Sequence, residues 1–533
     1  LSGNSGVDTL DGGSGNDTII GDSGSDRIIE LAGQGVDLIR AFVSYTISYN
    51  VEKLVMMGTD ALSATGNTMN NDIQGNDGAN TIDGGLGDDT LTGGAGGDVF
   101  RDAKGSDHYD GGAGYDRVEY LAATRGIKLD MVNTRLSTHI AYDDVFVGIE
   151  EISGSNYNDT LYGNDQGNTL YGRGANDLFY AREGNDRVYG ESGDDILFGG
   201  SGADTIDGGT GADRADYHHS TAGIQIDLRG AAHALFWGNV GGDAQGDELS
   251  GIEHVYGSQH NDTIVGDTGA NLLDGENGND ALHGFDGHDT LRGRAGNDTL
   301  QGNTGSDQME GGEGNDSYYV DSTGDVVVEL AGEGADRVYA AYTYTLGSHV
   351  ENLTLLGTGN LNGTGNALAN SISGNTGNNT LTGGAGDDSL YGGDGNDYLI
   401  DSDGDNYMDG GAGDDMTLFS YVTGTQVAGI STFVGGAGSD TAWFWSDTGG
   451  VFHGGAGFDI GERLGVGRDD AVLGAGFDRH VADGAALLDA QRLDRRAGEL
   501  HRAVGGAVHA DVTDDMQDQV LGRQVVRHLA VQH

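Results

Sequence analysis

The chain has 533 residues, of which 85 are acidic and 26 basic, so its formal net charge at pH 7 is −59. It contains 101 glycines and neither proline nor cysteine. The negative charge argues against nucleic acid and anionic membranes as partners, and the absence of cysteine leaves no thiolate to bind zinc or copper. A chain with so many charges per apolar residue lies close to the disordered class until its charge is neutralised.

A nine-residue glycine repeat organises most of the chain. Each unit reads G-G-x-G-x-D-x-U-x, where U is apolar, as in Gly293 to Gln301 (GRAGNDTLQ). Position six carries Asp in most units and Asn in the others, so only oxygen-bearing side chains of one length occur there. The repeats are expected in five tracts, 1–29, 66–118, 154–216, 257–319 and 365–418, followed by degenerate copies over 419–460.

Each unit predicts a turn followed by a short strand. Glycines at positions one, two and four allow backbone angles that are closed to other residues. Two units then form one coil of about 18 residues, and successive coils stack about 4.8 Å apart. The apolar residues at position eight are expected to fill a thin core, and in the fourth tract they are Leu282, Leu291, Leu300 and Met309.

Stacked coils predict ladders of carboxylates. The position-six Asp of one unit comes close to that of the second unit after it, as Asp280 does to Asp298. Two such charges about 4.8 Å apart repel by roughly 3 to 4 kcal/mol at an effective dielectric of about 20, so each ladder opposes folding until cations fill it. Carboxylates and inward-pointing carbonyls form an all-oxygen site, which suits calcium better than zinc or copper.

The candidate metal ligands are the position-six Asp residues Asp8, Asp17, Asp26, Asp89, Asp98, Asp107, Asp116, Asp186, Asp195, Asp204, Asp213, Asp280, Asp289, Asp298, Asp307, Asp316, Asp388, Asp397 and Asp415. One Ca²⁺ ion for each stacked pair within the tracts sets a ceiling of about 19 ions.

This repeat resembles the hemolysin-type nonapeptide of calcium-binding RTX (repeats-in-toxin) proteins. The resemblance implies an all-β fold, a right-handed parallel β-roll (the RTX solenoid), with calcium held between successive turns; β-rich inserts would interrupt its tracts. It also implies type I secretion of an unfolded chain, so we expect a secreted, extracellular protein that folds on binding calcium. Extracellular calcium modules fill at about 0.1 to 1 mM, a level that the cytosol does not reach.

Two kinds of insert separate the tracts, and each kind occurs twice. Type A is expected over 30–65 and 320–364, because Glu30 to Gly66 matches Glu329 to Gly365 at one constant offset without a gap. Alternation of apolar and polar residues predicts strands in both copies, at 43–47 and 342–346.

Type B is expected over 119–153 and 217–256. Both copies share Gly-Ile-x-x-Asp, which ends at Asp130 and Asp227, and both close with Gly-Ile-Glu. Duplication of both inserts favours an architectural role over a single active site.

The first unit after each insert departs from the repeat. At position four, where glycine is expected, these units carry Met69, Tyr157, His260 and Leu368. We expect them to join the insert strands to the roll and to bind calcium poorly. Gln166 and Ala175 also replace this glycine, so the start of the third tract contributes no candidate ligand.

No catalytic motif is legible in the chain. The segment from Asp401 to Asp405 resembles the start of an EF-hand loop, but Ala412 stands where that loop requires Glu, so we interpret it as a variant nonapeptide. The histidines lack the HExxH spacing of zinc proteases. No apolar run of about 18 residues predicts a membrane span.

Two alternatives to a free-standing calcium-binding protein stay open. The chain could be the repeat region of a secreted enzyme, a serralysin-like protease or an alginate epimerase, with its catalytic domain before Leu1. It could also be an adhesin or surface-layer component that has a cell-surface or matrix partner.

Residues 461–533 form an atypical tail rich in Arg, Ala and His. They contain no Asn, Ser, Ile, Lys, Tyr or Trp, and 485–504 has a weakly amphipathic helical pattern. A divergent export segment and a reading frame shifted near Gly461 both explain this break in composition.

Overall fold

The computed structural model describes residues 1–463, apart from 4–5, 102–103, 231–238, 402, 420–430, 445–449 and 458–459. The chain divides into two compact units, 1–467 and 468–533, and every described residue belongs to the first. The atypical tail beyond residue 463, with the helix expected over 485–504, therefore lies outside the described residues. Among the described residues, no helix has the length and apolar character needed to cross a membrane.

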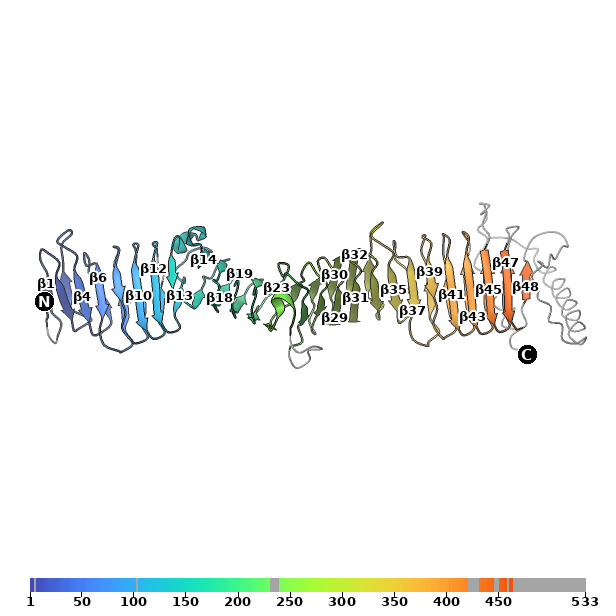
Figure 1. Ribbon diagram of the computed structural model, residues 1–533, viewed down its shortest axis with the longest axis horizontal. Coiled ribbons are helices and arrows are strands. Elements are labelled where there is room, and N and C mark those ends of the chain that lie inside the picture. Colours follow the sequence, from blue (N-terminus) through green and yellow to red (C-terminus); the bar gives the residue numbers. More distant parts are fainter. Residues whose placement is uncertain are drawn as a thin grey trace, which may run out of the picture. The chain divides into compact units, whose positions relative to one another are not determined.

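Coils of short parallel strands make up the described part of the first unit (Figure 1). Leu282 pairs with Leu300, and Thr299 pairs with Ser317, so the register advances by two nonapeptides per coil. The all-β parallel roll expected from the repeat is confirmed. The helical elements of the described residues are three short 3₁₀ helices, η1 (Thr134–Leu136), η2 (His139–Ala141) and η3 (Gly242–Ala244).

The strands of the described residues form six sheets, in which neighbouring strands belong to successive coils. The two-stranded sheet contains β1 (Thr9–Asp11) and β3 (Arg27–Ile29). The first seven-stranded sheet contains β2 (Thr18–Gly21), β4 (Leu38–Ala41), β6 (Lys53–Met56), β8 (Asp72–Gln74), β10 (Thr90–Ala95), β12 (His108–Ala113) and β15 (Val145–Val147). The first ten-stranded sheet contains β5 (Tyr45–Thr46), β7 (Ser63–Thr65), β9 (Thr81–Asp83), β11 (Val99–Arg101), β13 (Arg117–Glu119), β16 (Glu151–Ser153), β18 (Thr169–Gly174), β20 (Arg187–Ser192), β22 (Thr205–Asp207) and β25 (Glu248–Ser250).

The other three sheets follow along the chain. The second ten-stranded sheet contains β14 (Lys128–Asp130), β17 (Thr160–Tyr162), β19 (Leu178–Tyr180), β21 (Ile196–Phe198), β23 (Arg214–Asp216), β26 (His254–Tyr256), β28 (Leu272–Asp274), β30 (Thr290–Ala295), β32 (Gln308–Glu313) and β34 (Val326–Val328). The twelve-stranded sheet contains β24 (Gln225–Asp227), β27 (Thr263–Val265), β29 (Ala281–Gly287), β31 (Thr299–Gly305), β33 (Ser317–Val320), β35 (Arg337–Ala340), β37 (Asn352–Leu355), β39 (Ser371–Ser373), β41 (Ser389–Asp394), β43 (Tyr407–Ala412), β45 (Ser431–Ala437) and β47 (Gly450–Ala456). The second seven-stranded sheet contains β36 (Tyr344–Thr345), β38 (Asn362–Thr364), β40 (Thr380–Thr382), β42 (Tyr398–Asp401), β44 (Met416–Phe419), β46 (Thr441–Phe444) and β48 (Ile460–Arg463).

Each insert ends one sheet and starts another, while the sheet on the other face runs through it. In the first type A insert, β5 starts a sheet, whereas β4 and β6 continue the sheet of β2 and β8. The first type B insert likewise contains β15 at the end of one sheet and β14 at the start of the next. The inserts therefore interrupt the roll on one face only. The strands expected at 43–47 and 342–346 are present but shorter, as β5 and β36.

The core is a row of apolar side chains, one from most strands and two from several strands in and next to the type A inserts, such as Ile39 and Ala41 of β4. Leu282, Leu291, Leu300 and Met309 are fully buried, as expected for position eight. Type A inserts extend the row with Ile39 and Leu54 in the first copy and their counterparts in the second. Because most strands contribute only one residue to this core, it buries little apolar surface per residue, and the turns between strands decide whether the coils can stack.

Candidate metal centres

The position-six Asp residues form hydrogen-bonded ladders along the turns. The backbone N–H of Asp280 donates to Oδ1 of Asp298 at 2.8 Å, and that of Asp298 donates to Oδ1 of Asp316 at 2.7 Å. Both steps span 18 residues, so the expected stacking of Asp280 beside Asp298 is confirmed. All three side chains are at least 98% buried.

The second oxygen of most ladder carboxylates has no hydrogen-bond partner. Oδ2 of Asp298 is buried and unpaired. A Cβ atom placed on Gly293, at position one of the same unit, would lie 2.2 Å from this Oδ2 and 2.7 Å from the carbonyl oxygen of Gly311. Glycine thus leaves room where a carboxylate oxygen and a carbonyl oxygen converge. We call this space, bounded by the position-one glycine, the Asp carboxylate and the carbonyl oxygen, the glycine cradle. Calcium prefers ligands of these two kinds, so the residues of the cradle fit a calcium ion.

Burial raises the pKa of the ladder carboxyl groups Asp280 and Asp298. The pKa of Asp280 rises to about 8, chiefly through desolvation; the hydrogen bond from the Asp262 N–H opposes the rise, and the charges of Asp262 and Asp298 add to it. The pKa of Asp298 rises to about 6 for the same main reason. Without a cation, the folded ladder therefore disfavours the charged form of its own side chains.

The RTX calcium-binding nonapeptide repeat model matches the chain at residues 1–39, 65–100, 87–118, 146–179, 153–188, 180–215, 256–284, 283–318, 364–399 and 385–416, which together cover more than half of its length. The chain belongs to the RTX calcium-binding repeat family. A search of curated proteins found none that matches it.

Most of the predicted ligands offer an unpaired oxygen within the RTX ladders. Asp388 apart, Oδ2 is buried without a partner in every predicted Asp except Asp26 and Asp107. Asp26 accepts N–H bonds on both oxygens, and Asp107 accepts the hydroxyl of Tyr109. Asp388 differs from the other ladder residues because Asp401 lies beside it, and the two carboxyl groups form a hydrogen bond when one of them holds a proton.

Asp177 is a ladder member within the repeats that sequence reasoning missed. Asp177 follows the irregular Ala175, yet its Oδ2 is also buried without a partner. Burial raises the pKa of Asp177 to about 8, against the hydrogen bond donated by the Asp159 N–H. Ala175 takes up the left-handed conformation of the missing glycine, with φ of 72°, so the turn keeps its shape at this position.

The inserts continue the ladders, which the sequence analysis did not anticipate. Asp107 donates its N–H to Oδ1 of Asp144, a residue of the first type B insert, across 37 residues. The closing Gly-Ile-Glu of the type B inserts supplies Glu150 and Glu253, whose carboxylates accept the N–H groups of Asp116 and Asp213. The shared Gly-Ile-Glu was the signal for this role in the sequence.

Asn residues close the ladders at their ends without a cation. The side-chain amide of Asn71 lies 3.2 Å from the carbonyl oxygen of Val51 and donates a hydrogen bond to it. Asn370 makes the same contact with Val350 in the second type A insert. An amide group therefore supplies N–H donors at the place where a carboxylate would need a positive charge.

Serine has the same effect after the type B inserts. In the unit that begins at Gly154, the N–H and hydroxyl of Ser155 donate to the two oxygens of Asp159, at 2.6 and 2.8 Å. Ser258 repeats this arrangement with Asp262. These donors agree with the expectation that the first unit after an insert binds calcium poorly.

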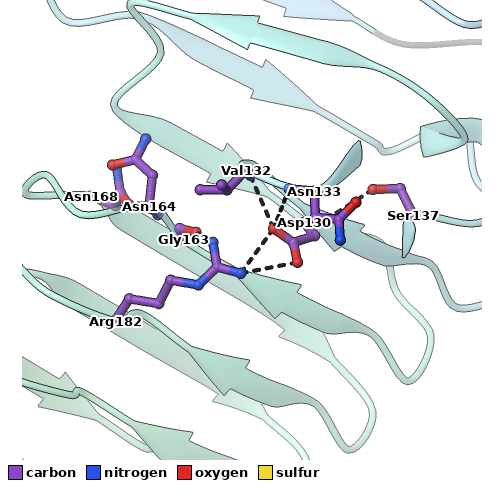
Figure 2. Close-up of polar contacts among 8 residues, drawn as sticks. All are labelled: Asp130, Val132, Asn133, Ser137, Gly163, Asn164, Asn168 and Arg182. Carbon is purple, nitrogen blue, oxygen red and sulfur yellow. Dashed lines mark hydrogen bonds and ion pairs between the residues drawn. The ribbon is translucent and has the colours of Figure 1, made fainter. Parts of the chain in front are cut away.

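The shared Asp of the type B inserts pairs with arginine. Figure 2 shows Asp130 between Arg182, whose Nη2 lies 2.9 Å from both carboxylate oxygens, and the backbone N–H groups of Val132 and Asn133. In the second copy, Arg229 pairs with Asp227 at 2.8 Å. Since a guanidinium neutralises each of these buried carboxylates, they act as structural ion pairs.

A methyl group in the cradle is expected to block metal binding. Gly293 does not have a positive φ, so Gly293→Ala leaves the backbone conformation accessible while its Cβ displaces Asp298 Oδ2. We expect calcium affinity of this turn to fall at least about tenfold. The control is Gly174→Ala, whose nearest neighbour would be Ser192 Oγ at 3.4 Å. Isothermal titration with calcium compares the two variants, and equal binding by both would contradict the cradle.

Acid is expected to stabilise the metal-free roll. The pKa of Asp280 is about 8 and that of Asp298 about 6 in the folded chain, against about 4 for an unfolded Asp. The folded state therefore binds more protons between these values, and its stability rises as the pH falls from about 8 to about 5. Far-ultraviolet circular dichroism of metal-free protein checks this; β structure that decreases over the same fall in pH would contradict it.

Proposed function

We propose that this RTX protein is secreted and folds when it meets extracellular calcium. The observation that carries the proposal is the row of buried ladder carboxylates whose Oδ2 atoms lack a partner. The formal net charge of −59 adds to it, because cations have to neutralise such a chain before it can become compact. The proposed ligands are the ladder Asp residues with an unpaired Oδ2, together with the carbonyl oxygens of position-one glycines.

The level of calcium would then decide where the chain folds. In the cytosol, calcium is too scarce to fill sites of modest affinity, so the chain stays expanded and suited to export as an unfolded polypeptide. Outside the cell, filling the ladders replaces carboxylate repulsion with metal binding, and the free energy of binding becomes free energy of folding. This order of events corresponds to the type I secretion that the RTX resemblance implies.

A comparison of calcium with magnesium tests this function. The hydrodynamic radius, measured by size-exclusion chromatography, is expected to fall as calcium rises through about 0.1 mM to several mM. Magnesium at the same concentrations is expected to compact the chain poorly, because it requires a tight octahedral shell and loses its water reluctantly. Equal compaction by the two ions, or full compaction at micromolar calcium, would contradict a role as an extracellular calcium-dependent module.

A further inference from the structure

The type A inserts bring a third carboxylate to the ladder. In the second copy, the ladder step from Asp316 to Asp336 spans 20 residues, where the step from Asp298 to Asp316 spans 18. The longer coil contains β34 and, directly after it, Glu329. One carboxylate oxygen from each of Asp316, Glu329 and Asp336 lies within 4.8 Å of the other two.

These three carboxylates are buried and incompletely paired. Asp316 is 1% exposed, Glu329 is 7% exposed and Asp336 is fully buried. Oδ2 of both Asp residues and Oε2 of Glu329 have no hydrogen-bond partner. None of the ion pairs found among the described residues involves this cluster. Three buried negative charges this close to one another are strongly unfavourable unless a cation lies between them.

One neighbouring hydroxyl orients the cluster without neutralising it. The phenol of Tyr318 accepts the N–H of Gly311 at 2.7 Å and donates to Oε1 of Glu329. This bond holds the Glu329 side chain over the ladder and leaves its other oxygen available. A neutral donor supplies no charge, so the cluster keeps its need for a metal ion.

The first type A insert repeats the cluster independently of that tyrosine. Asp17, Glu30 and Asp37 also offer carboxylate oxygens within 4.8 Å of one another, although the position equivalent to Tyr318 is Ile19. A Cβ placed on Gly12, at position one of the same unit, would lie 1.7 Å from Oε1 of Glu30 and 3.4 Å from Oδ2 of Asp17. The glutamate oxygen therefore enters the same glycine cradle that the repeat leaves open beside its own Asp.

We propose that each type A insert contains a three-carboxylate calcium site, Asp17–Glu30–Asp37 and Asp316–Glu329–Asp336, which binds more tightly than the two-carboxylate steps of the ladder. Affinity of oxygen-ligand sites for calcium rises with the number of charged ligands, and all six side chains are oxygen donors. The glutamate lies outside the nonapeptide, so the repeat pattern does not mark it. The inference deepens the proposed function and rests on it for the identity of the metal.

Graded removal of calcium from the full chain tests this site. Protein loaded with calcium is dialysed against increasing chelator, and the bound calcium is counted by atomic emission. The wild-type chain is expected to keep two ions at chelator levels that strip the ladders, one for each type A cluster. A third acidic group, Asp8–Asp22–Asp26, differs from these clusters because both oxygens of Asp26 already accept N–H bonds. Glu329→Gln and Glu30→Gln are each expected to keep one such ion, and the double variant none. Gln retains the acceptor for Tyr318, so the hydrogen bond survives the substitution.

A substitution in the same turn serves as the control. Glu333 accepts the N–H of Leu330 through Oε2 at 2.6 Å, and Gln34 accepts the N–H of Leu31 at 2.8 Å in the first copy. Glu333→Gln therefore removes one acid from the turn, keeps its hydrogen bond and leaves the cluster intact. This variant is expected to retain both tightly held ions.

Two results would overturn the inference. The double variant, shown to be folded by circular dichroism in calcium, could keep both tightly held ions. The wild-type chain could release all its calcium over one range of chelator concentration, as a single class of sites. This result does not depend on whether any variant folds. Both results leave calcium binding by the ladders in place, whereas a wild-type chain that binds no calcium at all would also remove the proposed function.

Discussion

Excess chelator is expected to abolish most of the β structure of the chain. Most ladder steps place two carboxylates one coil apart, and their repulsion of roughly 3 to 4 kcal/mol per pair recurs along the ladders when no cation is bound. The core that opposes it is a single row of side chains such as Leu282 and Leu300. We therefore expect an expanded chain with a disordered far-ultraviolet circular dichroism spectrum in chelator, and recovery of β structure when calcium is returned.

Sodium chloride controls for simple screening of charge. The ladder side chains are almost fully buried, and salt screens buried charges much less than exposed ones. About 0.5 M salt in chelator is therefore expected to leave the chain largely unfolded. A complete β spectrum in chelator at low salt would contradict the account, because the thin core alone would then suffice for folding.

Replacing Asp298 by alanine is expected to weaken two successive metal sites. Asp298 Oδ1 accepts the N–H of Asp280, and its neighbour Asp316 belongs to the next step of the same ladder. Asp298→Ala removes a carboxylate from both steps and leaves the buried Asp280 N–H without an acceptor, at a cost of about 1 to 3 kcal/mol. Calcium titration by circular dichroism is expected to show a higher midpoint and a lower number of bound ions.

Two further variants separate charge from hydrogen bonding. Asp298→Asn retains the acceptor oxygen, as Asn406 does when it accepts the N–H of Asp388 at 2.9 Å, so it is expected to fold but to bind fewer ions. Asn297 stands one position before Asp298, and its Oδ1 accepts the N–H of Asn315 in an exposed hydrogen bond. Asn297→Ala removes this hydrogen bond and is expected to match the wild type in calcium binding. An Asp298→Asn variant that binds as much calcium as the wild type would show that this carboxylate is not a ligand.

The coil and its ladder follow directly from the repeat, because a nine-residue period fixes which residues stack. Leu300 at position eight and Asp298 at position six could be placed from the sequence alone, since their neighbours one coil away are set by counting along the chain. Some units carry arginine where the repeat has glycine at position two. Arg182 and Arg294 adopt positive φ of 84° and 79° at this position, so the backbone of these residues is strained but the turn keeps its shape.

The inserts could not be predicted in this way, because they change the number of residues per coil. The step from Asp107 to Asp144 spans 37 residues, and nothing in the local pattern states which acid of the insert reaches the ladder. The pairing of Asp130 with Arg182 similarly joins residues 52 apart. Asn71 forms the uncharged end of a ladder because its amide donates to a carbonyl group of the preceding insert. The residue type at position six does not reveal this contact.

The positions of the metal ions test the central claim most directly. Anomalous diffraction from crystals grown in calcium locates each ion without reference to any variant. The account predicts ions in the glycine cradles, in contact with ladder oxygens such as Oδ2 of Asp298 and with the carbonyl oxygen of Gly311. Cradles without anomalous signal, in crystals whose only calcium lies on exposed carboxylates, would contradict it.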